Sequence, residues 1–339
     1  MHIDVFNGDA DGIFSLIQLR KAIQVTSQRL ITGVKRDNAL VQQISDAEAE
    51  GAEISILDVS FDKNTEELTR VLKRAKSVLY VDHHQAKTQF EASNLTTRID
   101  YQPTVCTGLL VREHLLALGY SLEADKDSAA WAIAAAFGDG LDAVANTEGE
   151  KLGYAPEQLA QLKELGVLVN YNGYGAALAD LHFRPDELYL QLFTYESPFA
   201  VVADTNSPFT ILKQGYEADL ALARECEPLI ADESLIAIML DNEPWARRIS
   251  GTLGSLLAAE NPDKAIVIAS ENQHAKGSEL NEVTLTISLR APKNELRGAG
   301  DICGGFPTGG GRAGAAGVNA LPVTTLPAFL QAVRDFYLD

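Results

Sequence analysis

The first 82 residues alternate between short apolar runs and longer segments whose apolar residues recur at helical spacing. The short runs predict strands, and the periodic segments between them predict amphipathic helices. Single helices between successive strands are typical of a parallel sheet with right-handed crossovers. The expected strands are residues 2–6, 30–34, 53–58 and 77–81, and the expected helices are residues 13–25, 38–50 and 63–73.

Beyond residue 82 the pattern is helical before strands return. Residues 198–208, bracketed by two prolines and rich in turn residues, indicate a boundary between two domains. We expect an α/β protein with a larger domain (1–200), a linker helix region (201–230) and a smaller α/β domain (231–339). The expected elements are helices 105–118 (capped by Thr104), 126–137, 157–177, 185–194, 209–226 and 246–259, and strands 234–240, 265–269 and 283–290.

Glycine is concentrated near the end of the chain. Nine of the 26 glycines lie between Gly298 and Gly317, and they include the run Gly309-Gly310-Gly311 before Arg312. This density predicts a loop rather than a packed element. Such a loop lets backbone N–H groups approach a ligand closely.

Polar side chains follow three of the four expected strands of the first sheet. The hexapeptide Asn7-Gly8-Asp9-Ala10-Asp11-Gly12 follows the first strand, Asp58 ends the third, and Asp82-His83-His84 follows the fourth. Ligands of parallel sheets bind outside the carboxyl ends of the strands, where all three groups would meet. Asp9 could instead act only as a helix cap, but the coincidence of three such ends favours a ligand site.

The residue types at these ends are those of a metal site. One imidazole and several carboxylates suit Mn²⁺, and no cysteine occurs in these motifs, which argues against structural zinc. A fourth carboxylate comes from Asp139, which is flanked by two glycines, with Asp142 as its competitor. Two ions bridged by one carboxylate would activate a water and stabilise charge on a phosphoryl oxygen.

Charge and cysteine content narrow the class of protein. Asp and Glu outnumber Lys and Arg 47 to 28, giving a net charge of −19, whereas proteins that hold long nucleic acids usually present a basic face. The acidic net charge therefore favours a small anionic substrate over a long nucleic acid. No apolar stretch is long enough for a membrane span, and the first residues do not read as a signal peptide. Three scattered cysteines predict a reducing cytoplasm.

The ordered motifs NGDADG, LDVS, VDHH and FGDG, followed by GGGRAGAAG, resemble the DHH phosphoesterase family. The resemblance runs from Asn7 to Gly317. It implies a parallel-sheet DHH domain, a smaller DHH-associated domain and an active site in the cleft between them. Relatives include linear dinucleotide phosphodiesterases, nanoRNases and the longer RecJ-type exonucleases.

The resemblance also implies roles for individual residues. A first metal ion would take Asp9 and Asp58, with Asn7 where relatives use His or Asp. A second would take Asp11, the bridging Asp58, His83 and Asp139. Three catalytic residues follow from the same motifs: Asp58, Asp82, which would brace the histidines, and His84, which would contact the scissile phosphate or leaving group.

Substrate binding is implied for the glycine-rich end of the chain, at Gly309, Gly310, Gly311 and Arg312. Arg312 stands where the family's usual motif has His, and an arginine can bind phosphate through two hydrogen bonds. Lys35 and Arg36, after the second strand, are weaker candidates for a phosphate contact. Strand-end basic residues of this kind are usually solvated.

These expectations define a metal-dependent hydrolase. We expect a Mn²⁺-dependent phosphodiesterase, with Mg²⁺ as a substitute ion, that cleaves short oligoribonucleotides or linear dinucleotides such as pGpG to nucleoside 5′-monophosphates. No long nucleic acid and no membrane is expected as a partner, and a homodimer is left open. The alternatives are a cyclic-dinucleotide phosphodiesterase, a single-strand exonuclease, a pyrophosphatase and a nucleotide-binding protein with a decayed metal site.

Overall fold

The computed structural model describes residues 1–87, 90–120, 126–272 and 283–338. The chain divides into two compact units, Met1–Gly215 and Tyr216–Asp339. The division falls within helix α10 (Pro208–Glu225), inside the segment where the sequence predicts a connecting helix region. The finer boundaries at residues 200 and 230 stay predictions. Each unit is described by itself.

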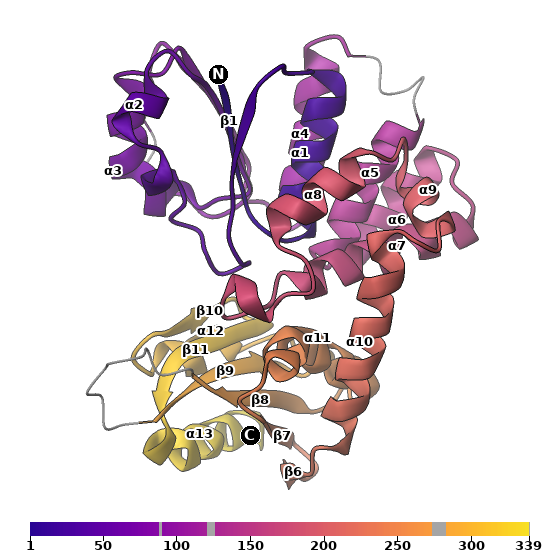
Figure 1. Cartoon of the computed structure of the whole chain (residues 1–339). Helices are drawn as coiled ribbons and strands as arrows, with labels where there is room; N and C mark the ends of the chain where they lie inside the picture. Colours follow the sequence, from indigo (N-terminus) through magenta and orange to yellow (C-terminus); the bar gives the residue numbers. More distant parts are fainter. Residues whose placement is uncertain (88–89, 121–125, 273–282, 339) are drawn as a thin grey trace. The chain divides into compact units, whose positions relative to one another are not determined.

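Five parallel strands form the sheet of the first unit, in the order β2-β1-β3-β4-β5 (Figure 1). Their apolar interiors are buried on both faces by helices, which explains why the central strands are short continuous apolar runs. The register aligns Phe6 with Leu57, and Leu57 with Val81, so that the next residues of three strands share one edge. The strands are β1 (His2–Phe6), β2 (Gln28–Ile31), β3 (Glu53–Leu57), β4 (Ser77–Asp82) and β5 (Leu95–Ile99).

Helices α2 and α3 lie on one face of this sheet, and α1 and α4 lie on the other (Figure 1). The second group continues into α5, which packs on α1, α4 and α7. The helices are α1 (Ala10–Ala22), α2 (Asp46–Ala49), α3 (Phe61–Leu72), α4 (Thr107–Ala117), α5 (Lys126–Gly138), α6 (Asp142–Lys151), α7 (Pro156–Asn172), α8 (Pro185–Phe193) and α9 (Pro198–Ala203), with 3₁₀ turns η1 (Val41–Gln43) and η2 (Leu178–Asp180).

Three local expectations are wrong. Residues 38–50 do not form one helix, because Ser45 caps a new four-residue helix and separates it from η1. The second strand ends at Ile31, and residues 32–38 form a loop. Helix α4 begins after Cys106, and Thr104 does not cap it.

Strand β5 was not expected from the sequence. It has three exposed side chains, so its pattern lacks the buried alternation that predicts a strand.

The second unit is a six-stranded mixed sheet in the order β10-β11-β9-β8-β7-β6. Strands β7 and β8 are parallel, and the other neighbours are antiparallel. The elements are β6 (Pro228–Ala231), β7 (Leu235–Leu240), α11 (Pro244–Glu260), β8 (Ala265–Glu271), β9 (Thr284–Arg290), α12 (Ala299–Gly304), β10 (Gly309–Gly311), β11 (Ala315–Pro322), the 3₁₀ turn η3 (Val323–Thr325) and α13 (Leu326–Leu338).

The glycine-dense segment is not a loop, contrary to expectation. It forms helix α12 and the antiparallel pair β10–β11, with Gly310 opposite Gly317. A Cβ at Gly309 would lie 1.9 Å from the carbonyl oxygen of Cys303, so this glycine permits close packing of backbone on backbone. The density of glycine therefore reflects tight packing of these elements as well as exposed backbone.

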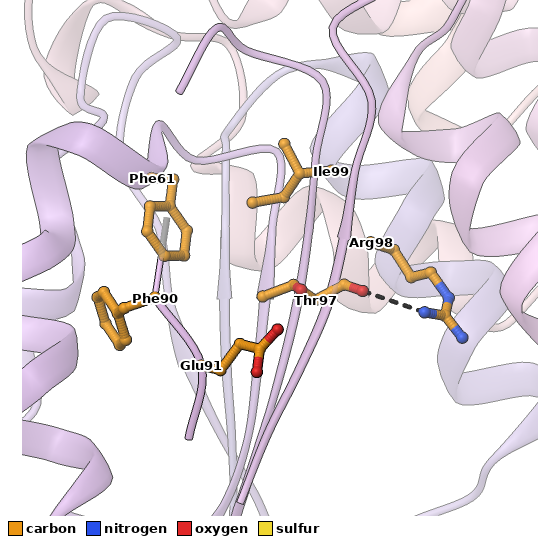
Figure 2. A pocket seen from close by; sticks show the side chains of 6 residues that line it. All are labelled: Phe61, Phe90, Glu91, Thr97, Arg98 and Ile99. Atoms are coloured by element: carbon orange, nitrogen blue, oxygen red, sulfur yellow. Dashed lines mark hydrogen bonds between the residues drawn. The ribbon is translucent and has the colours of Figure 1, made fainter. Parts of the chain in front are cut away.

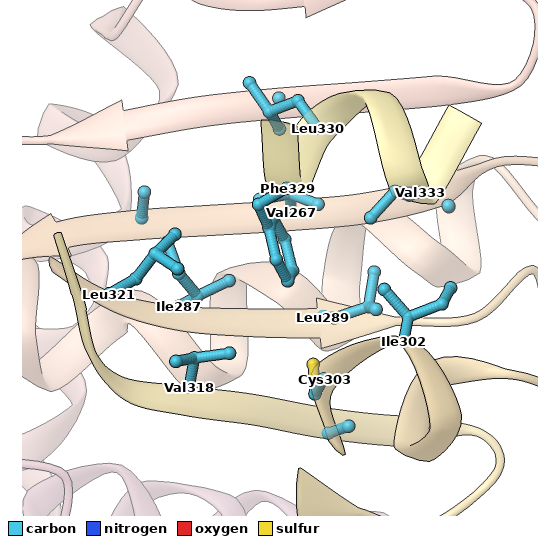
Figure 3. Close-up of a cluster of buried hydrophobic side chains, with 14 of the residues drawn as sticks. Val267, Ile287, Leu289, Ile302, Cys303, Val318, Leu321, Phe329, Leu330 and Val333 are labelled. Atoms are coloured by element: carbon cyan, nitrogen blue, oxygen red, sulfur yellow. The ribbon is translucent and has the colours of Figure 1, made fainter. Parts of the chain in front are cut away.

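Each unit has its own hydrophobic core. Figure 3 shows the core of the second unit, where Phe329 and Val333 of α13 pack on Val267, Ile287 and other side chains of the sheet. In the first unit the core between the sheet and helices α2 and α3 includes Tyr80 and Phe61. Among the described residues, no helix has both the length and the apolar character needed to cross a membrane.

Candidate metal centre

The first motif forms the turn between β1 and α1. The Oδ1 atom of Asp9 accepts a hydrogen bond from the Gly12 amide at 3.1 Å, so Asp9 is the N-cap of α1. A Cβ at position 12 would lie 2.2 Å from the Asn7 carbonyl oxygen, which explains the glycine. Because only one oxygen of Asp9 serves the cap, Oδ2 remains for another partner.

Asp11 points from the first turn of α1 to the start of α4. Its two carboxylate oxygens accept hydrogen bonds of 2.7 Å from the backbone amides of Thr107 and Gly108. These amides belong to the N-terminal turn of a helix, which attracts negative charge. The carboxylate is 1% exposed, and both oxygens keep lone pairs for a further ligand.

Asp58 follows β3 directly and is held in a strained conformation. Its φ of 58° lies in the left-handed region, and its amide donates to the carbonyl oxygen of Val81. Its Oδ1 accepts a 3.2 Å hydrogen bond from the Thr107 hydroxyl and lies 3.4 Å from Nε2 of His83. The carboxylate therefore contacts both the third motif, through His83, and the first residue of α4, through Thr107.

His83 is oriented so that one ring nitrogen faces the carboxylates. Its Nδ1 lies 3.0 Å from the carbonyl oxygen of Val105, which fixes the proton on Nδ1 when the ring is neutral. Its Nε2 then presents a lone pair 3.4 Å from Asp58 and 3.8 Å from both Asp11 and Asp139. An orienting hydrogen bond on the far nitrogen is the usual arrangement of a metal-binding histidine.

Asp82 binds both histidines. Its Oδ1 accepts hydrogen bonds from the backbone amide of His83 at 2.9 Å and from Nδ1 of His84 at 2.7 Å. Asp82 is fully buried, whereas the His84 side chain is 37% exposed, so Nε2 of His84 is on the open side of the pair. Asp82 thus contacts both histidines, and its bracing role stays a prediction.

The fourth motif brings Asp139, rather than Asp142, to the cluster. Asp139 follows the last turn of α5, and its Oδ2 lies 3.8 Å from Nε2 of His83. Asp142 begins α6 and forms an ion pair of 2.9 Å with Lys163. The favoured candidate Asp139 therefore lies beside His83, whereas its competitor Asp142 pairs with Lys163.

Lys35 lies inside the carboxylate cluster. Its ammonium is 2.5 Å from Oδ2 of Asp9 and 2.8 Å from Oδ1 of Asn170. The side chain is 26% exposed, so it is not the solvated strand-end lysine that the sequence favoured. A loop that leaves β2 and returns to the sheet edge carries it there.

The pKa values of these groups reflect crowding of buried negative charge. Burial, followed by the charge of Asp58, raises the pKa of Asp11 to about 7. Burial and the charge of Asp9 raise the pKa of Asp58 to about 6. Burial lowers the pKa of His83, but the hydrogen bond to Asp58 and the surrounding carboxylates outweigh it and raise the value to about 10.

The donor set fits a divalent cation. Asp58, His83 and His84 offer ligand atoms that all lie within 4.8 Å of one another, and Asp11 and Asp139 lie close to the same imidazole. Carboxylates so crowded repel one another unless a positive charge stands between them. Oxygen ligands with a single imidazole suit Mn²⁺ or Mg²⁺.

Solved structures share this two-unit architecture, although no protein-family model and no curated protein matches the sequence. The exonuclease RecJ bound to manganese is 15% identical, with a TM-score of 0.58 over 99% of this chain and 90% of that one. The DHH domain of a member of the s1p family of ribosomal proteins is 12% identical, with a TM-score of 0.64 over 100% and 86%. The chain has the fold of the DHH-domain proteins.

A third structure with the DHH fold is a pGpG-specific phosphodiesterase from Vibrio cholerae. It is 12% identical, with a TM-score of 0.50 over 100% of this chain and 99% of that one. Identities this low establish the fold and leave the activity to be argued from the residues. The expected α/β architecture, a parallel-sheet DHH domain with a smaller α/β domain, is confirmed.

The glycine run Gly309–Gly311 is the edge strand β10 of the second unit, and Arg312 occupies the turn that follows it. Gly310, Gly311 and Arg312 are exposed, and Arg312 exchanges backbone hydrogen bonds with Ala315. An edge strand leaves some backbone N–H groups unpaired on one side, although the Gly309 amide donates to the Phe306 carbonyl oxygen. Together with the Arg312 side chain, these groups stay predicted ligands of a phosphate.

A separate pocket of about 420 Å³ borders the strand ends of the DHH unit. Figure 2 shows Phe61 and Phe90 on one side of it, Ile99 and Thr97 of β5 on the other, and the Glu91 carboxylate at its lower end. Arg98, the sixth lining residue, points away from the two rings and hydrogen bonds to the Thr97 carbonyl. The pocket is near the cluster, because Ile99 is paired with Asp82 and Phe61 follows Asp58 by three residues.

Sequence reasoning missed the residues that hold the ligands in place. These supporting residues are Thr107 and Gly108, which bind Asp11, Val105, which orients His83, Lys35, which binds Asp9, and Asn170, which accepts a hydrogen bond from Lys35. Most of these contacts use backbone atoms, which carry no residue-type signal. The position of Lys35 close to the predicted sheet edge was the one available signal.

Proposed function

We propose that this protein is a Mn²⁺-dependent phosphodiesterase that hydrolyses short oligoribonucleotides, or linear dinucleotides such as pGpG, to nucleoside 5′-monophosphates. The observation that carries the proposal is the orientation of His83, whose Nε2 faces Asp11, Asp58 and Asp139. A structural ion pair needs only one carboxylate beside an imidazole. Several carboxylates gathered around one imidazole are typical of a metal centre.

The residues that would hold the ion are Asp11, Asp58, His83 and Asp139, with Mg²⁺ as a substitute. When bound there, a divalent cation lowers the pKa of a water and offsets charge on a phosphoryl oxygen. The resemblance implies a pair of ions, the other at Asn7, Asp9 and Asp58. The geometry around His83 favours an ion held by Asp11, Asp58, His83 and Asp139.

His84 would act as the general acid. The Asp82 carboxylate accepts the Nδ1 proton of His84, so Nε2 is the atom that can deliver a proton to substrate. Burial lowers the pKa of His84, but the hydrogen bond to Asp82 and the nearby Asp58 outweigh it, so the pKa lies above its ordinary value. As water oxygen bonds to phosphorus and the P–O3′ bond breaks, this proton would pass to the departing 3′ oxygen.

Two neighbours support phosphodiester chemistry, and one of them supports a dinucleotide as the substrate. Neighbours with the same fold include an exonuclease described as bound to manganese and a phosphodiesterase described as specific for pGpG. The net charge of −19 disfavours a long polyanion. We propose a cytoplasmic location, which fits three free cysteines.

The pocket between Phe90 and β5 is suited to a nucleobase of that substrate. Aromatic rings stack on bases, and a carboxylate accepts two hydrogen bonds from the N1–H and N2–H groups of guanine. Phe90 and Glu91 supply these two groups at the pocket. The Thr97 hydroxyl adds a further donor or acceptor on β5.

Product analysis in Mn²⁺ tests the proposal. The purified protein is incubated with pGpG, a longer single-stranded RNA and a cyclic dinucleotide, alongside the His83→Ala variant. We expect rapid release of 5′-monophosphates from pGpG only, and loss of turnover in the variant. Equal cleavage of long RNA would contradict the short-substrate proposal, and binding without turnover would indicate a nucleotide-binding protein.

A further inference from the structure

Lys35 adds a fixed positive charge to the centre at the place where the family resemblance implies a first metal ion. That ion would be bound by Asp9, yet Oδ2 of Asp9 is already 2.5 Å from the Lys35 ammonium. The other carboxylate oxygen of Asp9 caps α1. Both oxygens of this expected ligand therefore have partners within the chain.

The position of Lys35 is built by several independent contacts. Its backbone amide donates to the Gly173 carbonyl at 2.9 Å, and its ammonium donates to Asn170 at 2.8 Å. The ammonium also lies 5.4 Å from the centre of the Tyr174 ring, within range of a cation–π interaction. Three residues near the end of α7 thus hold one lysine, which is more than a solvated side chain requires.

Asn7 completes the arrangement. Its Nδ2 donates to the Lys35 carbonyl oxygen at 3.1 Å, which fixes the orientation of the amide because a carbonyl can only accept. Asn7 is 3% exposed, and no described residue donates to its Oδ1. Where relatives have a stronger ligand, this chain has a neutral amide bonded to the loop that carries Lys35. Asn7 and the Lys35 loop are therefore joined by a direct hydrogen bond.

We propose that the Lys35 ammonium takes the place of the first metal ion, so that the centre binds one divalent cation through Asp11, Asp58, His83 and Asp139. This inference rests on the metal dependence in the proposed function. An ammonium and a divalent cation on the same carboxylate repel each other, and the fixed lysine excludes the second ion.

Lys35 also has a hydrogen left for substrate. An ammonium has three N–H donors, and Asp9 and Asn170 take two of them. The third can donate to a phosphoryl oxygen and stabilise its charge in the transition state, as a second ion would. Unlike a metal ion, the ammonium cannot activate a water, so this chain would rely on the remaining ion for the nucleophile.

Metal stoichiometry tests the inference without substrate. The full chain is stripped with EDTA, reloaded with Mn²⁺ and dialysed, and bound manganese is measured by mass spectrometry and electron paramagnetic resonance. We expect one Mn²⁺ per chain with the hyperfine pattern of an isolated ion. Lys35→Ala should bind two ions with an exchange-coupled spectrum, and Lys35→Arg should bind one.

Arg36→Ala is the matched control, since it removes the neighbouring exposed cation; one ion is expected. Two coupled ions in the wild-type protein would overturn the inference and leave the proposed function standing. No bound manganese in the wild type would overturn both. If Lys35→Ala fails to fold, Lys35→Met replaces it, and a wild-type count of two still decides against the proposal.

Discussion

The ammonium of Lys35 lies 2.5 Å from Oδ2 of Asp9, and this pair is part of the same centre as His83 and its three carboxylates. Burial raises the pKa of Asp9, but the charge and hydrogen bond of Lys35 outweigh it, so the pKa lies below its usual value. The lysine therefore keeps one carboxylate charged while burial raises the pKa of Asp11 and Asp58.

Replacing Lys35 with Met should destabilise the metal-free protein. The change leaves the buried Asp9 carboxylate without its cation, which costs about 2 kcal/mol, below the value for a fully enclosed pair because Lys35 is 26% exposed. Urea unfolding in EDTA measures the loss. Mn²⁺ should stabilise the variant more than the wild type. Equal stability of Lys35→Met and Arg36→Met in EDTA would contradict the prediction.

Replacing His84 with Gln should separate proton transfer from metal binding. Gln cannot deliver a proton, so kcat for a dinucleotide should fall by about 10²-fold or more. Because Asp11, Asp58, His83 and Asp139 remain, bound Mn²⁺ per chain should not change. Steady-state kinetics and metal analysis check the two parts. Loss of the ion in this variant would instead identify His84 as a ligand.

Replacing Phe90 with Ala should weaken binding of the dinucleotide. Removal of one base-stacking ring costs about 1–3 kcal/mol, which corresponds to a rise in KM of roughly 5- to 150-fold. Glu91→Gln should affect guanine-containing dinucleotides more than adenine-containing ones. Phe193→Ala, a half-buried phenylalanine that does not line the pocket, is the control. An unchanged KM in Phe90→Ala would rule out the pocket as a base site.

Asp232 should give the second unit a pH-dependent contribution to stability. The hydrogen bonds from Arg334 and from the amides of Ser234 and Leu235 lower the pKa of Asp232 to about 2. A lowered pKa in the folded state favours the charged form, so the contribution is present above about pH 4 and is lost as pH falls toward about 2. The pair is about one-third exposed, so solvent screening keeps the contribution under about 1 kcal/mol.

Unfolding of Asp232→Asn compared with the wild type checks this prediction. The difference in unfolding free energy should be largest near neutral pH and should shrink through the same acidic range. A difference that does not vary with pH would show that the Asn variant disturbs packing instead of removing a charge. Asp335→Asn serves as a control, because its side chain accepts only from Gln331 among the contacts of the described residues.

The strands and ligand motifs of the first unit follow from sequence because each has a local cause. Continuous apolar runs encode buried strands, and the register of a parallel sheet then brings Asp9, Asp58 and His83 to one edge. Which of Asp139 and Asp142 reaches His83 depends on where α5 ends and α6 begins. Helix ends cannot be predicted to within a few residues from sequence. Structure was needed to decide it.

Other features could not be predicted because their causes lie far away in the chain. Asp11 is bound by amides of a helix that begins 96 residues later, and those amides have no sequence signature. Lys35 is bound by Asn170, 135 residues away. Strand β5 forms because β4 offers it an edge, although its own side chains are mostly exposed.

The left-handed backbone conformation of Asp58 limits which residues are tolerated at this position. At a φ of 58°, only Gly, Asn and Asp are accommodated readily, and β-branched or longer residues add strain. Of these three, only Asp offers a carboxylate. Substitution of Asp58 by Asn or Gly would retain the turn. It would remove the carboxylate that contacts His83 and Thr107. A descendant that loses this chemistry can therefore keep the fold intact, and its sequence would show Asn or Gly at position 58.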